Sequence, residues 1–163
     1  MRGLPRRATI PPMARNPLPA LATTLSFVDR INHTDLAGLA ELMHPDHRLL
    51  VMDVPPVVGR DANVEAWRGY FTAFPEYVIH PRLFVPDGNR VAVFGATTGS
   101  HLNLADDEEL ALGVIWLAEV SDGLVTVWQV RDDSQALRQD LGISEVDQWL
   151  NEAQPLDERS WKP

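Results

Sequence analysis

Asp132 ends an apolar segment that begins at Leu124, and its position in that segment suggests proton-transfer chemistry. Alternate residues of a strand point to opposite faces, so Trp128, Val130 and Asp132 would lie on one side. A carboxyl group in an apolar cavity has a raised pKa, which suits it to taking and returning a proton. Two alternatives stay open: Asp132 caps a helix that begins near Ser134, or it pairs with a neighbouring arginine.

Two further ionisable residues lie near the ends of predicted strands. His101 follows a segment whose same-face residues include Gly95 and Gly99, and two glycines on an inward face leave volume for a ligand. Histidine exchanges protons near neutral pH, so His101 is a candidate proton shuttle, with a loop-edge histidine bonded to backbone as the alternative. Asp53 precedes two prolines and is either an auxiliary base or a solvated turn residue.

Neither a metal nor a cofactor is expected. His44 and His47 flank a proline-aspartate turn, but two histidines without a third convergent ligand do not define a metal site. The chain has no cysteine, which excludes a thiolate nucleophile, a disulfide and a cysteine-held metal. The lack of cysteine also fits a reducing compartment, so we expect a cytoplasmic protein.

The charge distribution argues against nucleic acids as partners. The net charge of the 163-residue chain is −9, and residues 1–19 carry four arginines and no acid, so the rest of the chain carries −13. Such an acidic surface repels phosphate backbones. No apolar run approaches the roughly 20 residues that cross a bilayer, so no membrane is expected either. Residues 1–19, with five prolines, are predicted to be a disordered arm, and Met13 is a second candidate start.

The apolar spacing predicts three helices followed by a sheet. Two helices are expected between Ala20 and Met43, the second with Asp35 as its N-cap, and a third runs from its cap Asp61 to Pro75. The predicted strands cover residues 48–54, 77–84, 90–102, 110–120 and 124–132. Short turns join the last four, so we expect an antiparallel sheet.

This order of elements is typical of the α+β class. We expect a curved antiparallel sheet with three helices on its concave face, enclosing one pocket. The domain is predicted to cover residues 20–143 and to be followed by an acidic C-terminal helix and tail at 144–163. The acidic run at residues 106–109 is expected to be a solvated hairpin loop.

Several short motifs follow one another along the chain in an order that is typical of one protein family. They are Asn32–Leu39, Gly59–Asp61 with Trp67-Arg68, Ala73–Glu76, Gly88–Val93, Thr98–His101, and Trp128–Asp132 followed by Leu137–Gly142. Together they resemble the SnoaL-like polyketide cyclase branch of the nuclear transport factor two superfamily, over about residues 20–143. The resemblance implies a cone-shaped, cystatin-like α+β barrel and a homodimer. The superfamily also contains ketosteroid isomerases, limonene epoxide hydrolases, dehydratases and non-catalytic modules, so fold alone does not choose the function.

The resemblance also suggests roles for individual residues. Phe27 and Trp116 occupy the positions of the isomerase oxyanion donors, which argues against steroid isomerisation. The cyclase branch carries its acid or base near the end of the last strand, where Asp132 stands. In our interpretation Asp132 takes a proton beside a carbonyl and His101 donates to the oxygen that gains charge. Asp53, near the position of the isomerase base, is an auxiliary base or polar anchor. The expected substrate-binding residues are Phe27, Trp67, Thr97, Trp116 and Trp128.

Three hypotheses of function follow. The first is a small cofactor-independent SnoaL-like cyclase or isomerase that acts on a hydrophobic carbonyl compound such as a polyketide intermediate. The second is a non-catalytic small-molecule-binding or dimerisation module, and the third is an epoxide hydrolase or dehydratase that uses the same pocket. The expected homodimer would pair through the outer sheet face that carries Val125, Val127 and Gln129.

Overall fold

The computed structural model describes residues 17–142. Residues up to Arg131 form one compact unit, and Asp132 begins a second. The predicted arm lies outside the described residues except for residues 17–19, which are helical, and the predicted C-terminal helix and tail at 144–163 lie outside as well. Within the described range, no helix is long and apolar enough to cross a membrane.

Five helices and six strands make up the described chain. The helices are α1 (Pro17–Asn32), α2 (Leu36–Glu41), α3 (Arg60–Ala73), α4 (Asp106–Leu110) and α5 (Gln135–Asp140). The strands are β1 (Met43–Val51), β2 (Val57–Val58), β3 (Val78–Asp87), β4 (Arg90–Thr98), β5 (Val114–Ser121) and β6 (Leu124–Asp132). The α+β class predicted from the sequence is confirmed.

The helix caps agree with the sequence at α2 and differ at α3. The Asp35 carboxylate accepts a hydrogen bond from the Gly38 backbone N–H at 2.9 Å, which confirms it as the α2 cap. The prediction of Asp61 as the α3 cap is wrong, because Gly59 holds that position with φ of 96° and Asp61 lies in the first turn. The buried Asn63 amide instead donates to three backbone carbonyls around the β1–β2 connection and anchors the start of α3 there.

The six strands form one sheet in the order β2-β1-β6-β5-β4-β3. The β1–β2, β3–β4 and β4–β5 pairs are antiparallel, whereas β1 and β6 are parallel, so the expectation of a wholly antiparallel sheet is wrong at this pair. A short turn fixes the relative direction only of the two strands that it joins. β1 and β6 lie far apart in the sequence, so no turn between them indicates their direction. Their pairing sets Leu49 beside Trp128 and Val51 beside Val130.

Several predicted strand boundaries shift, and two of the shifts affect candidate site residues. β1 ends at Val51, which leaves Asp53 exposed in the following turn with φ of 57°. β4 ends at Thr98, so His101 lies in a turn beyond the strand. The expected loop at residues 106–109 is the short helix α4, and β5 consequently begins only at Val114.

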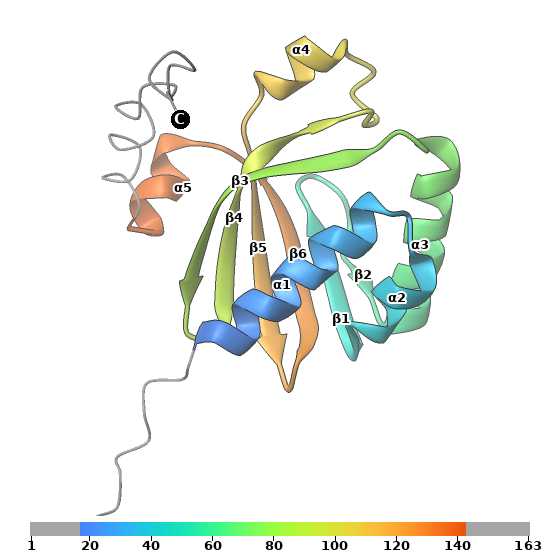
Figure 1. Ribbon diagram of the computed structural model, residues 1–163, viewed down its shortest axis with the longest axis vertical. Helices are drawn as coiled ribbons and strands as arrows, with labels where there is room; N and C mark the ends of the chain where they lie inside the picture. Colours follow the sequence, from blue (N-terminus) through green and yellow to red (C-terminus); the bar gives the residue numbers. More distant parts are fainter. Residues whose placement is uncertain (1–16, 143–163) are drawn as a thin grey trace, which may run out of the picture. The chain divides into compact units, whose positions relative to one another are not determined.

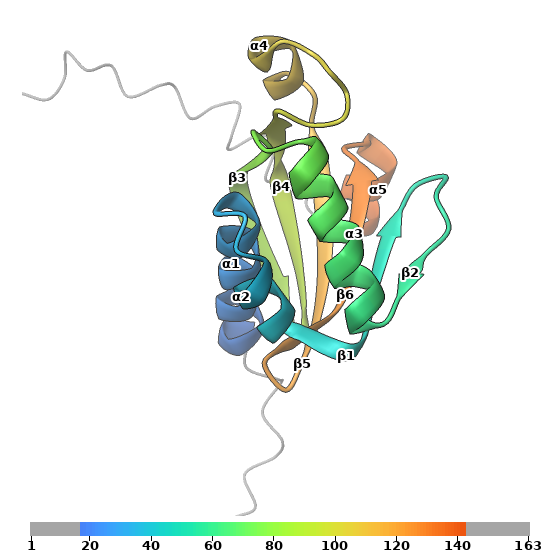
Figure 2. The same cartoon turned by 90° about the vertical axis from the view of Figure 1, so that its right-hand side faces the viewer.

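The helices α1, α2 and α3 cover one face of the curved, unclosed sheet (Figures 1 and 2). α1 packs across β3, β4 and β5, whereas α3 packs against β1 and β2. The core lies between these layers. Its largest fully buried apolar side chains are Trp116, Trp128, Phe27, Ile31, Leu39, Met43, Ile79 and Ile115.

The sheet face expected to pair two protomers is only partly available. Val125 is fully buried in the core cluster together with Trp128, three residues away, so strict alternation does not hold at the start of β6. Val127 and Gln129 are half-buried. The homodimer stays a prediction, and Val125 cannot contribute exposed surface to it.

Candidate functional site

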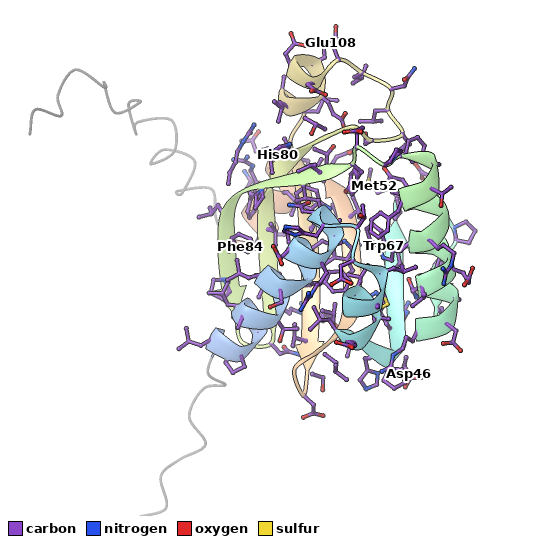
Figure 3. The ribbon with its side chains drawn as sticks, turned by 45° about the vertical axis from the view of Figure 1, so that its right-hand side comes forward. Asp46, Met52, Trp67, His80, Phe84 and Glu108 are labelled. Atoms are coloured by element: carbon purple, nitrogen blue, oxygen red, sulfur yellow. The ribbon has the colours of Figure 1, made fainter. Side chains whose placement is uncertain are left out.

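An apolar cavity of about 230 Å³ lies between α3 and the strands β1 and β6. Figure 3 shows Trp67 pointing from α3 toward the sheet. The described residues that line the cavity are Leu49, Val51, Ala66, Trp67, Tyr70, Tyr77, His101, Trp128 and Val130. The set contains no carboxylate, and its ionisable members are His101 and two tyrosines.

Of the aromatic residues predicted to bind substrate, two line the cavity and two pack against one of its lining residues. Trp67 and Trp128 line the cavity as expected. Phe27 and Trp116 lie outside the lining but contact Trp128, with ring centroids at 5.0 and 6.5 Å. A fixed aromatic wall of this kind favours flat, apolar ligands.

Tyr70 and His101 form a hydrogen-bonded pair at the cavity. The Tyr70 hydroxyl lies 2.9 Å from Nδ1 of His101, and the backbone N–H of His101 donates to the same hydroxyl at 3.4 Å. Tyr70 is half-buried and His101 is exposed, so the pair reaches from the cavity to solvent. Burial raises the pKa of Tyr70, the bond to His101 opposes this rise, and the charge of Glu109 adds to it.

Glu109, on α4, is only 1% exposed. Its carboxylate accepts hydrogen bonds from the Thr97 hydroxyl at 2.5 Å and from the Ser100 backbone N–H at 3.4 Å. Burial opposes ionisation of Glu109, but the bonds from Ser100 and Thr97, with the charge of His101, lower its pKa below the ordinary value. The expectation of a fully solvated acidic run is therefore wrong at Glu109. Thr97, predicted to bind substrate, is buried and holds this carboxylate instead.

Two buried donors at the cavity have no protein partner. The indole N–H groups of Trp67 and Trp128 are enclosed and make no hydrogen bond within the described structure. A buried donor without an acceptor costs roughly 1–3 kcal/mol.

The predicted acids lie in more open surroundings. Asp132 is exposed and begins the second compact unit. It is not the cap of α5, because the Ser134 hydroxyl accepts from the Leu137 N–H at 3.2 Å, and Arg138 pairs with Asp133. Asp53 is exposed too, and it does not line the cavity.

The histidines that suggested a metal turn have different surroundings. His44 is half-buried beside Asp46, whereas His47 is fully buried, with Nδ1 donating to the Val125 carbonyl at 2.6 Å. Burial lowers the pKa of His47, although the bond to Val125 opposes the shift. Across residues 17–142, no group of three or more His, Asp or Glu side chains is arranged to hold a metal ion.

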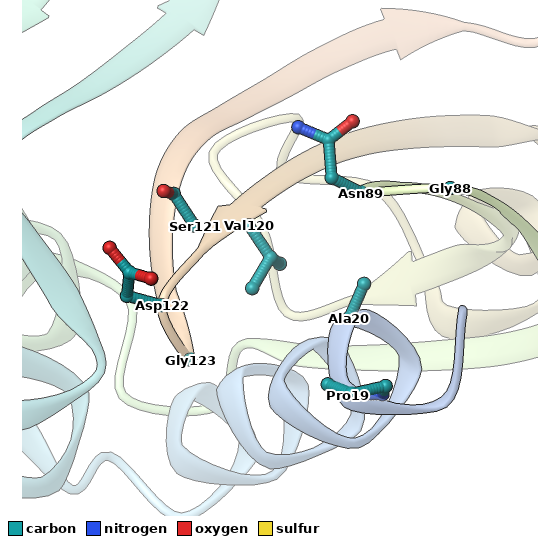
Figure 4. A pocket seen from close by; sticks show the side chains of 8 residues that line it. All are labelled: Pro19, Ala20, Gly88, Asn89, Val120, Ser121, Asp122 and Gly123. Carbon is teal, nitrogen blue, oxygen red and sulfur yellow. The ribbon is translucent and has the colours of Figure 1, made fainter. Parts of the chain in front are cut away.

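A second cavity, of about 430 Å³, lies where the start of α1 meets two hairpin turns. Figure 4 shows Asn89 and Asp122 from these turns and Pro19 and Ala20 from α1. Among the described residues that line it, Asp122 alone is charged, and it is exposed. With no buried or convergent polar side chains, this cavity is a weaker candidate than the cavity beneath α3.

Tyr70 and Glu109 are the site residues that sequence reasoning missed. Tyr70 had a usable signal, because it lies three residues after Trp67 and four before Phe74 on the apolar face of a predicted helix. Glu109 had none, since its neighbours are also acidic and its two donors come from distant residues.

The fold is that of an α+β domain with an apolar cavity beneath one helix. The chain belongs to the SnoaL-like domain family, whose profile matches residues 25–128. No curated protein matches the sequence.

Solved structures from three bacteria share the fold. A candidate ketosteroid isomerase from Kribbella flavida superposes with a TM-score of 0.59 at 19% identity, over 74% of this chain and 82% of that one. A candidate SnoaL-like polyketide cyclase from Jannaschia sp. CCS1 also gives 0.59 at 19% identity, over 91% and 99%. A cystatin-fold protein from Novosphingobium aromaticivorans gives 0.59 at 13% identity, over 69% and 97%. These likenesses confirm the cystatin-like fold.

Proposed function

We propose that the protein is a small cofactor-independent enzyme, a cyclase or isomerase, that acts on a hydrophobic carbonyl compound of the polyketide type. The observation that carries the proposal is the 2.9 Å hydrogen bond between Tyr70 and His101 at a cavity with otherwise aromatic and aliphatic walls. Hydrogen-bond donors in such surroundings stabilise charge that develops on a carbonyl oxygen more strongly than they would in water. Family membership and the two named structural neighbours support the same class.

The cavity walls would orient the substrate. A flat ring would lie against Trp67 and Trp128, which line the cavity. The modest cavity volume of about 230 Å³ favours a ligand portion of one or two rings.

In the proposed reaction, the Asp132 carboxylate takes a proton from the carbon beside the carbonyl. The electron pair of the broken C–H bond forms a C=C bond, and negative charge moves to the carbonyl oxygen. Tyr70 donates a hydrogen bond to that oxygen, and His101 donates to Tyr70 through Nδ1. For cyclisation, the enolate carbon attacks a second carbonyl carbon of the same molecule, the first C=O bond re-forms, and the electron pair of the second C=O moves to its oxygen. That alkoxide then takes the proton from Asp132, which restores the carboxylate. The base role of Asp132 stays a prediction, supported by its exposed carboxylate two residues beyond Val130 on β6.

Hydrogen–deuterium exchange tests this chemistry without knowledge of the natural substrate. The probe is 2-tetralone, a bicyclic ketone with acidic protons beside its carbonyl, incubated with the protein in D₂O and followed by mass spectrometry. We expect faster deuterium uptake than in buffer alone, with the acceleration lost in Tyr70→Phe and in Asp132→Asn. Asp29→Asn, an exposed acid on α1, is the matched control and should retain it.

A non-catalytic binding module is the second candidate, favoured by the absence of a carboxylate among the described cavity-lining residues. In that case 2-tetralone binds, as shown by quenching of tryptophan fluorescence, but takes up deuterium no faster than in buffer. Binding without exchange would therefore contradict the enzyme proposal and support the module.

A further inference from the structure

Glu109 is the one buried acid among the described residues, and it carries no ion pair with an arginine or lysine there. Removing a carboxylate from water is costly unless hydrogen bonds or an opposite charge compensate. Two donors, Thr97 and Ser100, provide part of that compensation. The charge of Glu109 adds to the raised pKa values of Tyr70 and Tyr77, and the charge of His101 contributes to the lowered pKa of Glu109. Tyr70, Tyr77 and His101 all line the cavity.

The Glu109 carboxylate is hydrogen-bonded to the backbone one residue before His101. The Ser100 N–H that Glu109 accepts belongs to the residue immediately before His101, and the Ser100 hydroxyl accepts from the Leu102 N–H at 3.2 Å. The Thr97 hydroxyl ties the same carboxylate to β4. The negative charge of Glu109 is therefore held at a fixed place close to His101.

The Tyr70–His101 bond can carry its proton in two ways. Either the Tyr70 hydroxyl donates to a bare Nδ1, or Nδ1–H donates to the Tyr70 oxygen. In the second arrangement the oxygen accepts both Nδ1–H and the backbone N–H of His101, so the hydroxyl proton is free to point at a ligand. A fixed negative charge nearby favours the protonated ring and hence the second arrangement.

We propose that Glu109 is a positioning residue that keeps His101 in the form carrying Nδ1–H, so that Tyr70 donates its proton to the bound ligand. The groups around His101 are Tyr70 on α3, Phe74 at the C-cap of α3, and Glu109 on α4, which is bonded to the neighbouring Ser100. Glu109 is thus the negative charge among them. The effect on the ligand rests on the proposed function, whereas the coupling between Glu109 and His101 does not.

Nitrogen-15 NMR of the histidine rings tests the coupling directly. At a pH of about 6.5, where an ordinary imidazole is half protonated, we compare the wild type with Glu109→Gln and Glu108→Gln. Glutamine keeps the size and one acceptor oxygen of Glu109 but removes its charge. Glu108 is exposed on the same helix and points away from the sheet (Figure 3), so its variant matches the change in net charge. His101→Gln identifies the His101 signals.

We expect the ratio of protonated to unprotonated Nδ1 of His101 to fall by about two- to five-fold in Glu109→Gln, the size of a solvent-screened pair interaction. Glu108→Gln should leave the ratio within the error of the wild type. Equal ratios in Glu109→Gln and Glu108→Gln would overturn the proposal and leave Glu109 with a structural role only.

A reciprocal measurement covers the case in which Glu109→Gln does not fold. In the wild type, the carboxyl-carbon signal of Glu109 should move when the pH is raised from about 5 to about 8, the range in which histidines change charge. In His101→Gln, an exposed substitution, that movement should vanish. A Glu109 signal that behaves identically in both proteins would overturn the coupling. Neither measurement uses turnover, so either result can be told apart from success or failure in the deuterium-exchange experiment.

Discussion

Glu109 and Asp132 are two carboxylates whose surroundings are the reverse of what their sequence contexts suggest. Glu109 belongs to an acidic run, yet it is buried and accepts hydrogen bonds from Thr97 and Ser100. Asp132 ends an apolar strand, yet it is exposed, and no hydrogen bond or ion pair of the described residues involves its carboxylate. The Glu109 carboxylate is thus occupied by hydrogen bonds within the protein, whereas the Asp132 carboxylate is available to a ligand.

This difference separates two uses of a negative charge. Hydrogen bonds that favour the ionised form lower the pKa of Glu109, so it is a poor proton acceptor but a stable charge near His101. An exposed carboxylate without partners can approach a substrate and take a proton from it. The comparison therefore predicts that substitutions at Asp132 change activity alone, whereas substitutions at Glu109 change stability and the state of its neighbours.

The largest expected effect is on proton abstraction. Asp132→Asn should slow the protein-dependent deuterium uptake of 2-tetralone by roughly 10²- to 10⁴-fold, the usual contribution of a positioned base. Its free energy of unfolding in urea should stay within about 0.5 kcal/mol of the wild type, as for most exposed substitutions. Unchanged deuterium uptake in Asp132→Asn would show that Asp132 is not the base, and its proposed difference from Glu109 would no longer hold.

Tyr70→Phe should follow, with a loss of about 10²- to 10³-fold in the same exchange, the range for one oxyanion donor. The substitution keeps the aromatic ring and removes the hydroxyl that bonds His101. Binding of 2-tetralone, followed by fluorescence quenching, should change far less than the exchange rate, because the aromatic walls remain. A parallel loss of binding and exchange would instead indicate that Tyr70 only holds the ligand.

Glu109→Ala should destabilise the fold by about 1.5–3 kcal/mol, because hydrogen bonds to a charged group are lost and the Thr97 and Ser100 donors are left without an acceptor. Glu108→Ala, the exposed neighbour, should stay within about 0.5 kcal/mol. Urea unfolding measures both. Similar values for the two variants would mean that Glu109 is no more committed to the fold than the solvated members of its run.

The sequence was sufficient for features that depend on local periodicity. Strand alternation correctly predicted that Trp128 and Val130 share a face, and both line the cavity. The helical period placed Trp67 on the inner face of α3, where it is buried. The same periodicity says which way a side chain points but not what lies beyond it, so it could not establish whether Asp132 was enclosed.

The remaining features depend on residues that are distant along the chain. Tyr70 and His101 are 31 residues apart, and no local pattern predicts that their side chains meet. The parallel pairing of β1 with β6 joins strands from opposite ends of the domain, although it sets Val51 beside Val130 at the cavity. Glu109 looks like its acidic neighbours until the fold brings Thr97 and Ser100 to it.

The smallest expected effect is the acid sensitivity that Glu109 gives to the fold. Its pKa is lowered in the folded protein, so around the ordinary carboxyl range the unfolded chain binds more protons than the folded chain. The stabilisation is therefore complete above that range and is lost as the pH falls through the folded pKa. Glu109→Gln has no carboxyl group to protonate at this position. The difference between its free energy of unfolding and that of the wild type should therefore be shifted in favour of the variant at pH 3.5, compared with pH 6. Asp132→Asn, measured in urea at the same two pH values, is the comparison variant and should show no such difference, because no hydrogen bond or ion pair of the described residues holds that carboxylate in the folded protein. If the free energy of unfolding of the two variants changed equally with pH, Glu109 and Asp132 would not differ in their contribution to stability.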